Sequence, residues 1–182
     1  MNTAPYSGSL TAEQFLFYEI RIASKLYMQG IPADISKIRE DNLFQYPTER
    51  MISRMTKACY RRLDALNNQM LIQELSSAPV EIAKQINLYA IMRYNRLVWD
   101  FMIQVIGEKF RTQDFSFERK DLNTFFSRLQ ARVGVTAQSV KSRVFWFAAW
   151  LKRSTWIISK VQFLIPFFFV KNWSKEFVRT TI

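Results

Sequence analysis

Residues 47–66 of the chain read PTERMISRMTKACYRRLDAL, and this stretch decides the fold class. At about 100° per residue, its large apolar side chains fall on one side of a helix: Ile52, Met55, Cys59, Leu63 and Leu66. Four basic side chains fall on the opposite side, within about 60° of one another: Arg50, Arg54, Lys57 and Arg61. The spacing predicts an amphipathic helix with an apolar face toward a core and a cationic stripe toward solvent, and Pro47 suits its first position.

This cationic stripe has two interpretations. A row of Arg and Lys side chains suits contact with phosphate groups, which bind cations without regard to nucleic-acid sequence. The same row is also the ordinary solvated face of an amphipathic helix, and Glu49 and Asp64 near its ends could neutralise part of it. Cys59 lies in the apolar stripe, so we expect a buried small hydrophobic side chain rather than a reactive thiol.

Helical signals extend on both sides of this stretch. Thr11 and Gln14 have the spacing of a capping box, so we expect a helix from there to about residue 29, where Gly30 ends it. Periodicity and turn residues then predict further helices over residues 33–40, 67–77, 80–93, 96–110 and 122–133.

The sequence SSAP at residues 76–79 is the best candidate boundary between two halves. We expect an N-terminal helical subdomain over residues 1–77, which holds the basic helix. We expect a C-terminal helical subdomain over residues 78–182, which holds a helix-turn-helix and a basic aromatic tail.

The candidate helix-turn-helix lies around a single glycine. After the helix predicted over residues 122–133, Gly134 permits a tight turn, Val135 can pin it to the core and Thr136 can cap the next helix. Three side chains project from the start of that helix, where base edges or phosphates would be met: Gln138, Lys141 and Ser142. The alternative is two packed helices joined by a glycine turn.

A short β-hairpin is the non-helical element that we expect. At residues 156–165, β-branched and aromatic residues flank Ser159 and Lys160, at the place where a winged-helix domain has its wing. Lys160 at the tip would point at a phosphate backbone. The predicted fold class is mainly α: two small helical subdomains with helix-turn-helix or winged-helix-like elements, and at most this short hairpin near the C-terminus.

Positive charge is concentrated in the last third of the chain. The chain has 26 Lys and Arg residues against 15 Asp and Glu residues, a formal net charge of +11. Residues 127–182 hold ten of these basic residues and a single acid, Glu176, together with four of the five Trp residues. Cations interleaved with large aromatic rings suit a polyanion, so nucleic acid is the favoured partner. An anionic membrane surface and a solvated basic surface over a Trp-rich core are the alternatives.

Composition excludes several classes of function. The chain has no histidine, so the commonest general base and the commonest metal ligand are both missing. A single cysteine excludes a disulfide framework and a thiolate zinc site, and it suits a reducing compartment. Four scattered glycines leave no loop that could cradle phosphates. We expect no catalytic residues, no metal, no cofactor and no enzymatic activity.

The most apolar runs, residues 144–151 and 161–170, are shorter than the roughly 20 residues that a membrane-spanning helix needs. The N-terminus shows no basic region followed by a long apolar stretch, so no signal peptide is visible. We expect a cytoplasmic protein without a membrane span.

Several segments resemble the BrxA family of bacterial BREX phage-defence systems. They are YSGSLT at residues 6–11, the following helix with Glu19 and Arg21, LYAIM at 88–92, RLVWDF at 96–101 and VIGEK at 105–109. The likeness covers residues 5–130 and, more loosely, TAQSVK at 136–141. The resemblance implies a helical DNA-binding accessory protein without known catalysis, which acts beside a methyltransferase, an ATPase and other BREX components.

The predicted function is therefore non-catalytic binding of duplex DNA, mainly through phosphate contacts. The expected DNA-binding residues are Arg50, Arg54, Lys57, Arg61, Gln138, Lys141, Ser142, Arg143, Lys152, Arg153 and Lys160. One alternative is a structural scaffold that docks other defence-complex subunits through its aromatic C-terminal region, with Trp150, Trp156 and Trp173 as contact candidates. An RNA-binding helical protein is another.

Overall fold

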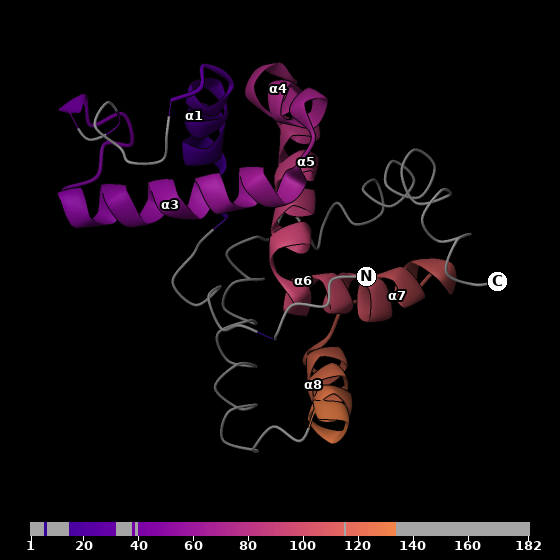
Figure 1. Cartoon of the computed structure of the whole chain (residues 1–182). Coiled ribbons are helices and arrows are strands. Elements are labelled where there is room, and N and C mark those ends of the chain that lie inside the picture. The colour runs from indigo at the N-terminus through magenta and orange to yellow at the C-terminus, as the bar shows by residue number, and fades with distance from the viewer. Residues whose placement is uncertain (1–5, 7–14, 32–37, 39, 115, 134–182) are drawn as a thin grey trace. The chain divides into compact units, whose positions relative to one another are not determined.

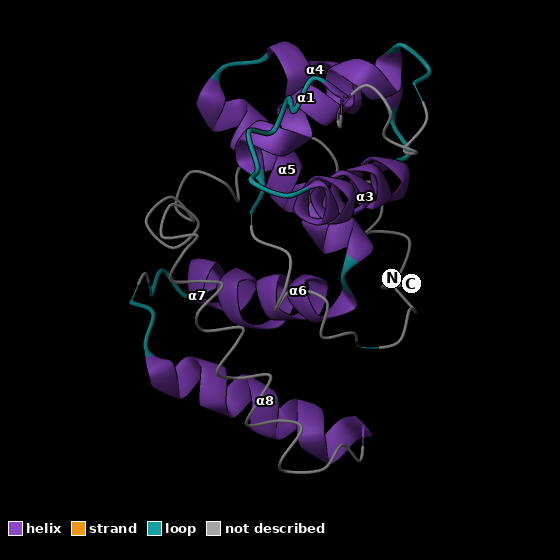
Figure 2. Ribbon diagram, turned by 90° about the vertical axis from the view of Figure 1, so that its left-hand side faces the viewer, coloured by secondary structure: helices purple, strands orange, loops and turns teal. Residues whose placement is uncertain are grey.

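The computed structural model describes residues 6, 15–31, 38, 40–114 and 116–133 (Figure 1). Their regular elements are α1 (Phe17–Met28), α3 (Glu49–Leu66), α4 (Gln69–Ser77), α5 (Val80–Tyr94), α6 (Arg96–Phe101), the π-helical turn η2 (Met102–Ile106), α7 (Gly107–Arg111) and α8 (Arg119–Val133). None of the described residues lies in a strand (Figure 2), so the mainly helical class is confirmed. The predicted helix-turn-helix turn and the C-terminal hairpin lie outside the described residues.

The basic amphipathic helix forms as α3. Thr48 is its N-cap, and the Thr48 hydroxyl accepts a hydrogen bond from the backbone N–H of Met51 at 3.3 Å. The helix therefore begins at Glu49, two residues after Pro47, and it ends where Asn67 takes a left-handed φ of 45°. The predicted apolar face is buried throughout, and Cys59 and Leu63 are fully buried.

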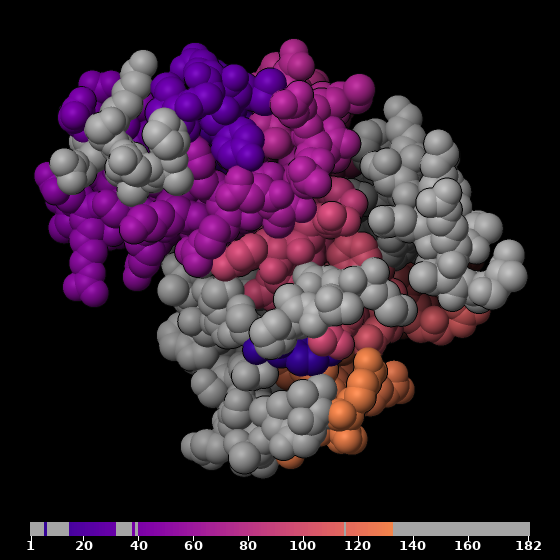
Figure 3. Space-filling view, in the orientation of Figure 1, coloured from indigo at the N-terminus to yellow at the C-terminus, as the bar shows by residue number. Residues whose placement is uncertain are grey.

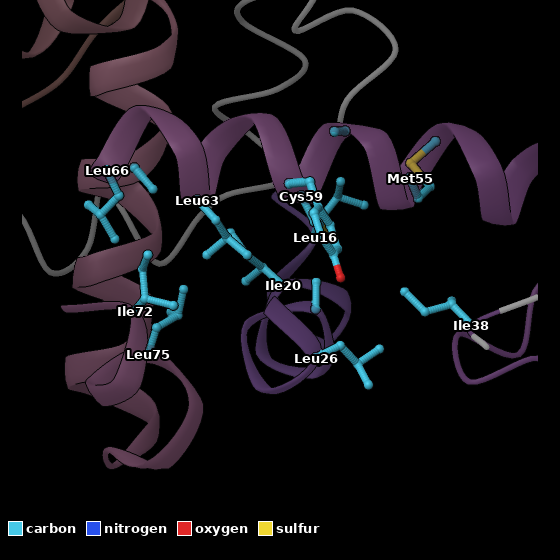
Figure 4. Packing of buried hydrophobic residues seen from close by; sticks show 14 of the residues in the cluster. Leu16, Ile20, Leu26, Ile38, Met55, Cys59, Leu63, Leu66, Ile72 and Leu75 are labelled. Carbon is cyan, nitrogen blue, oxygen red and sulfur yellow. The ribbon is translucent and has the colours of Figure 1, made fainter. Parts of the chain in front are cut away.

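The chain divides into two units, Met1–Trp99 and Asp100–Ile182. In the first unit, α1 packs against α3 and α4, and α5 packs against α3 and α4. The core joins Ile20 of α1, Leu63 and Leu66 of α3, and Ile72 and Leu75 of α4 (Figure 4). Buried residues of α5 complete this core.

A buried polar cluster fixes the start of α1. The Arg62 guanidinium of α3 and the Asn87 amide of α5 both donate to the backbone carbonyl of Phe15, at 3.0 Å and 2.7 Å. Next to this carbonyl, Leu16 has a left-handed φ of 52°, and the helix begins only at Phe17. The predicted helix from Thr11 is therefore wrong at residues 15 and 16, because two distant donors hold this backbone out of helical geometry. The predicted end is confirmed, because α1 stops at Met28 and Gly30 has a φ of 72°.

Arginine side chains also join the helices of this unit. The Arg21 guanidinium of α1 donates to the carbonyls of Ser76 and Ala78, both at 3.1 Å, where α4 ends. Arg93 near the end of α5 donates to the carbonyl of Ala65 at 3.3 Å, where α3 ends. Each cation satisfies carbonyls that have no partner within their own helix. These two arginines therefore have a structural role.

Removing the Arg62 side chain should destabilise the first unit. Arg62 is fully buried, so Arg62→Ala would lose packing as well as a charge-assisted hydrogen bond, and we expect a loss of about 2–4 kcal/mol in the free energy of unfolding. Arg62→Met should lose less, because it keeps most of the packed volume. Urea denaturation followed by circular dichroism measures both.

The neighbouring Arg61 provides the matched control for this prediction. Its side chain is exposed, so Arg61→Ala should change the free energy of unfolding by about 1 kcal/mol or less. Equal losses for Arg61→Ala and Arg62→Ala would show that the buried cluster does not organise the fold.

A helix break separates α5 from α6, as the sequence predicted. The side-chain oxygen of buried Asn95 accepts hydrogen bonds from the backbone N–H groups of Leu97 and Val98, at 3.0 Å and 3.4 Å, and so caps α6. The helix expected over residues 96–110 is interrupted by the π-helical turn η2, which the sequence did not predict. None of the described helices is both long enough and apolar enough to cross a membrane.

The second unit holds η2, α7 and α8. The predicted apolar side of α8 is buried: Leu122, Phe125, Phe126 and Leu129. The ring of Phe101 packs edge-on against the rings of Phe117 and Phe125, at centroid distances of 5.9 Å and 5.5 Å. The Nζ atom of Lys109 in α7 lies 2.8 Å from Oδ2 of Asp114 and 3.2 Å from Oδ2 of Asp121. These ion pairs join α7 to the start of α8.

Candidate nucleic-acid interface

The exposed face of α3 carries the four basic side chains that the sequence singled out. Arg50, Arg54, Lys57 and Arg61 are all exposed, whereas the opposite face of the helix is buried. The first and last of them are about 16 Å apart along the helix axis, at 1.5 Å per residue. Figure 3 shows side chains of α3, in purple, at the molecular surface. The helix therefore presents a straight cationic stripe to solvent.

Most of the stripe is not neutralised by nearby carboxylates. Within the described ranges, Arg50, Arg54 and Lys57 form no ion pair. Asp64, near the end of α3, accepts a hydrogen bond from the Tyr27 hydroxyl of α1 at 2.9 Å. This hydrogen bond raises the pKa of Tyr27, with burial and the Asp64 charge adding to the effect. Asp64 keeps its charge, but the four cations of the stripe outnumber Glu49 and Asp64, the two carboxylates of α3.

Arg61 is held in place more firmly than an ordinary surface arginine. Its Nε donates to the carbonyl of Lys57 at 3.1 Å, and its guanidinium carbon lies 5.7 Å from the centroid of the Tyr94 ring. Tyr94 is the last residue of α5, next to Arg93, which joins α5 to the end of α3. An aromatic face at this distance attracts the cation, so the ring limits the conformations of the Arg61 side chain.

The sequence did not predict the contact between Tyr94 and Arg61. The two residues lie on different helices and have no periodic relation, so only the packing of α3 against α5 brings them together. The regular geometry of a helix predicts which side chains three or four residues apart are neighbours. It does not predict which side chains meet across two packed helices.

The other predicted contact residues belong to the C-terminal part of the chain. Gln138, Lys141, Ser142, Arg143, Lys152, Arg153 and Lys160 lie outside the described residues. Within the described residues, no group of three or more Cys, Asp and Glu side chains could hold a metal ion. The described part of the candidate interface is therefore the α3 stripe with Tyr94.

Comparison with known proteins places the chain in a family. The model of the BrxA family matches residues 4–141, a range that includes the whole of α3 and α8. The BREX protein BrxA of Bacillus cereus (strain H3081.97) is 31% identical over 127 residues, which are 69% of this chain and 63% of that protein. The matched region thus spans less than two thirds of that relative. No solved structure is significantly similar. Because the family model matches most of the length of this chain, the chain belongs to the BrxA family.

Proposed function

We propose that the chain is a non-catalytic DNA-binding accessory protein of a bacterial BREX phage-defence system. The observation that carries the proposal is the exposed cationic stripe of α3, in which three of the four basic side chains form no ion pair with any described residue. Unneutralised cations in a row attract a polyanion and release its condensed counterions on binding. Membership of the BrxA family and the name of the Bacillus cereus relative support the connection with BREX.

Duplex DNA is the polyanion that suits this stripe. A duplex carries about one negative charge per 1.7 Å of its axis, so a row of cations about 16 Å long can meet several phosphates at once. Arg side chains bind phosphate through a planar fork of donors, whereas Lys contributes a point charge. Such contacts position the protein on DNA without reading its sequence.

The proposed interface continues beyond the described residues. We place further phosphate contacts at Lys141, Arg143, Lys152, Arg153 and Lys160, and hydrogen bonds to bases or sugars at Gln138 and Ser142. In this proposal, the helix after Gly134 enters a groove as the recognition helix of a helix-turn-helix, and a hairpin around Lys160 forms a wing. The protein acts in the cytoplasm together with other BREX components.

The test is a binding titration of the full chain against duplex DNA, single-stranded DNA and RNA. The proposal expects duplex DNA to bind most tightly and to be displaced by unlabelled duplex. A scaffold that docks other defence subunits through the aromatic C-terminal region would bind all three weakly. Weak binding without preference would therefore support the scaffold and contradict the DNA-binding proposal.

Tyr94 should strengthen DNA binding by holding Arg61. A long side chain that is already ordered loses less conformational entropy when it binds, and immobilising one costs about 0.5–1.5 kcal/mol. We expect Tyr94→Leu to weaken binding of a labelled duplex about two- to tenfold. The salt dependence should stay unchanged, because every cation of the stripe remains. Fluorescence anisotropy at several salt concentrations measures both quantities.

Two control variants separate this effect from a general loss of structure. Tyr94→Phe keeps the aromatic face and should bind as the wild type does. In the Arg61→Ala background, Tyr94→Leu should have no further effect, because the side chain that Tyr94 holds is absent. An equal loss in both backgrounds would mean that Tyr94 does not act through Arg61.

A further inference from the structure

The exposed face of α8 has a composition unlike that of an ordinary solvated helix. Hydroxyl and amide side chains surround Lys120 in its middle: Asn123, Thr124 and Ser127. Cationic side chains occupy its two edges, Arg119 on one and Arg128 with Arg132 on the other. All seven of these side chains are exposed. The face therefore combines hydrogen-bonding groups with flanking positive charge, and it lies on α8 (Figure 2), which belongs to the second unit.

The carboxylates near this face are already engaged. Oδ2 of Asp121 forms an ion pair with Nζ of Lys109 at 3.2 Å, and it accepts a hydrogen bond from the backbone N–H of Glu118 at 2.8 Å. Glu118 lies 3.1 Å from Lys120. Arg119 and Arg128 form no ion pair within the described ranges, and Arg132 donates to the neutral Gln104 side chain at 3.3 Å. Three arginine charges on the face thus lack a carboxylate partner among the described residues.

We propose that this face of α8 is a second contact surface for duplex DNA. A helix with its side chains is about 10–12 Å wide, which matches the width of the major groove, about 12 Å. In that position, the edge arginines meet the phosphates that border the groove. The central amide and hydroxyl groups face base edges, to which Asn, Ser and Thr donate and accept hydrogen bonds. The inference rests on the proposed function, because it takes duplex DNA as the ligand.

This surface is distinct from the α3 stripe and from the predicted recognition helix. The α3 stripe belongs to the first unit and consists of four cationic side chains. The recognition helix was predicted after Gly134, whereas α8 ends at Val133. In a helix-turn-helix, the first helix crosses the backbone, so direct groove contact by α8 adds to that motif rather than following from it.

The experiment measures binding of the full chain to a short labelled duplex between about 50 and 200 mM salt. Arg119→Gln/Arg128→Gln should weaken binding about tenfold and make the slope of log affinity against log salt shallower by about 2, because about 0.9 is lost per phosphate contact. The matched control is Lys25→Gln/Arg111→Gln. It removes the same amount of charge from exposed positions on α1 and α7, and it should keep the wild-type slope.

A second variant tests the uncharged side chains in the middle of the face. Asn123→Ala/Ser127→Ala keeps every charge and raises helix propensity, so α8 should fold as before. We expect about fivefold weaker binding with an unchanged salt slope, because hydrogen bonds rather than ion contacts are lost. Unchanged affinity in this variant would overturn the groove contact.

The outcomes separate this inference from the proposed function. If the α8 charge variant binds as its control does while removal of the α3 charges weakens binding, the inference about α8 is wrong and the proposed function stands. If the wild-type chain does not bind duplex DNA at low salt, both are wrong. A loss of affinity and slope in the α8 variant, with none in the control, supports the second surface.

Discussion

Replacing Arg54, Lys57 and Arg61 together by alanine should weaken binding of duplex DNA about 100-fold at moderate salt. Each side chain is expected to make one phosphate contact, and a net contribution of roughly 0.9 kcal/mol from each of the three contacts corresponds to this loss. The slope of log affinity against log salt should become shallower by about 3, because three fewer counterions are released. The three positions are exposed on α3, and alanine favours a helix, so the fold should survive.

The control for this variant removes three cations that lie outside α3 and outside the α8 face. Lys25→Ala, Lys84→Ala and Arg111→Ala together produce the same net charge. If attraction by overall charge were sufficient, the two triple variants would bind equally weakly. We expect the control to keep most of the affinity, because phosphates lie close only to the side chains that contact them.

A comparison with the predicted recognition helix ranks the two basic surfaces. We expect Lys141→Ala/Arg143→Ala to do more harm than the α3 triple variant, because residues 127–182 carry ten basic residues and one acid. If the α3 variant abolishes binding and the Lys141/Arg143 variant leaves affinity and slope unchanged, the turn at Gly134 is only structural. The DNA-binding function would then stand with α3 as its main surface.

Periodicity alone was enough to predict α3 and its two faces. Every apolar position singled out in residues 49–66 is buried and every cation of the stripe is exposed, because the helix packs one side against α1 and α5. The break before α6 was also predicted, and the cap formed by Asn95 explains it. In α8, the side predicted to be apolar is buried. Signals of this kind depend on neighbours within about four residues, which the sequence displays directly.

Features that depend on contacts distant in sequence could not be predicted in this way. The start of α1 is set by Arg62 and Asn87, which reach the Phe15 carbonyl from two other helices. Arg62 adjoins the cationic stripe in sequence, but its side chain is fully buried and has a structural role. Tyr94 meets Arg61 only because α5 ends beside α3. The same holds for the contribution of α5 to the core, which packing against α3 and α4 produces.

The α8 face shows a different limit of the sequence analysis. As the first helix of the predicted helix-turn-helix, residues 122–133 are marked in the sequence by their apolar side and by the glycine that follows. The hydroxyl and amide side chains of the outer face are uncharged, and such side chains are common on surface helices. Their meaning depends on the exposed arginines at the edges and on the engagement of Asp121 by Lys109.

A salt titration tests directly whether this BrxA-family chain binds duplex DNA through phosphate contacts. The full chain is titrated against a labelled duplex at a series of salt concentrations from about 50 to 200 mM. If five or more phosphates are neutralised, the slope of log affinity against log salt is about −4 to −5 or steeper, and affinity falls at least about 250-fold over this range. Micromolar or tighter binding at low salt with this slope is the expected result. A flat salt response, or no binding at low ionic strength, would contradict the claim.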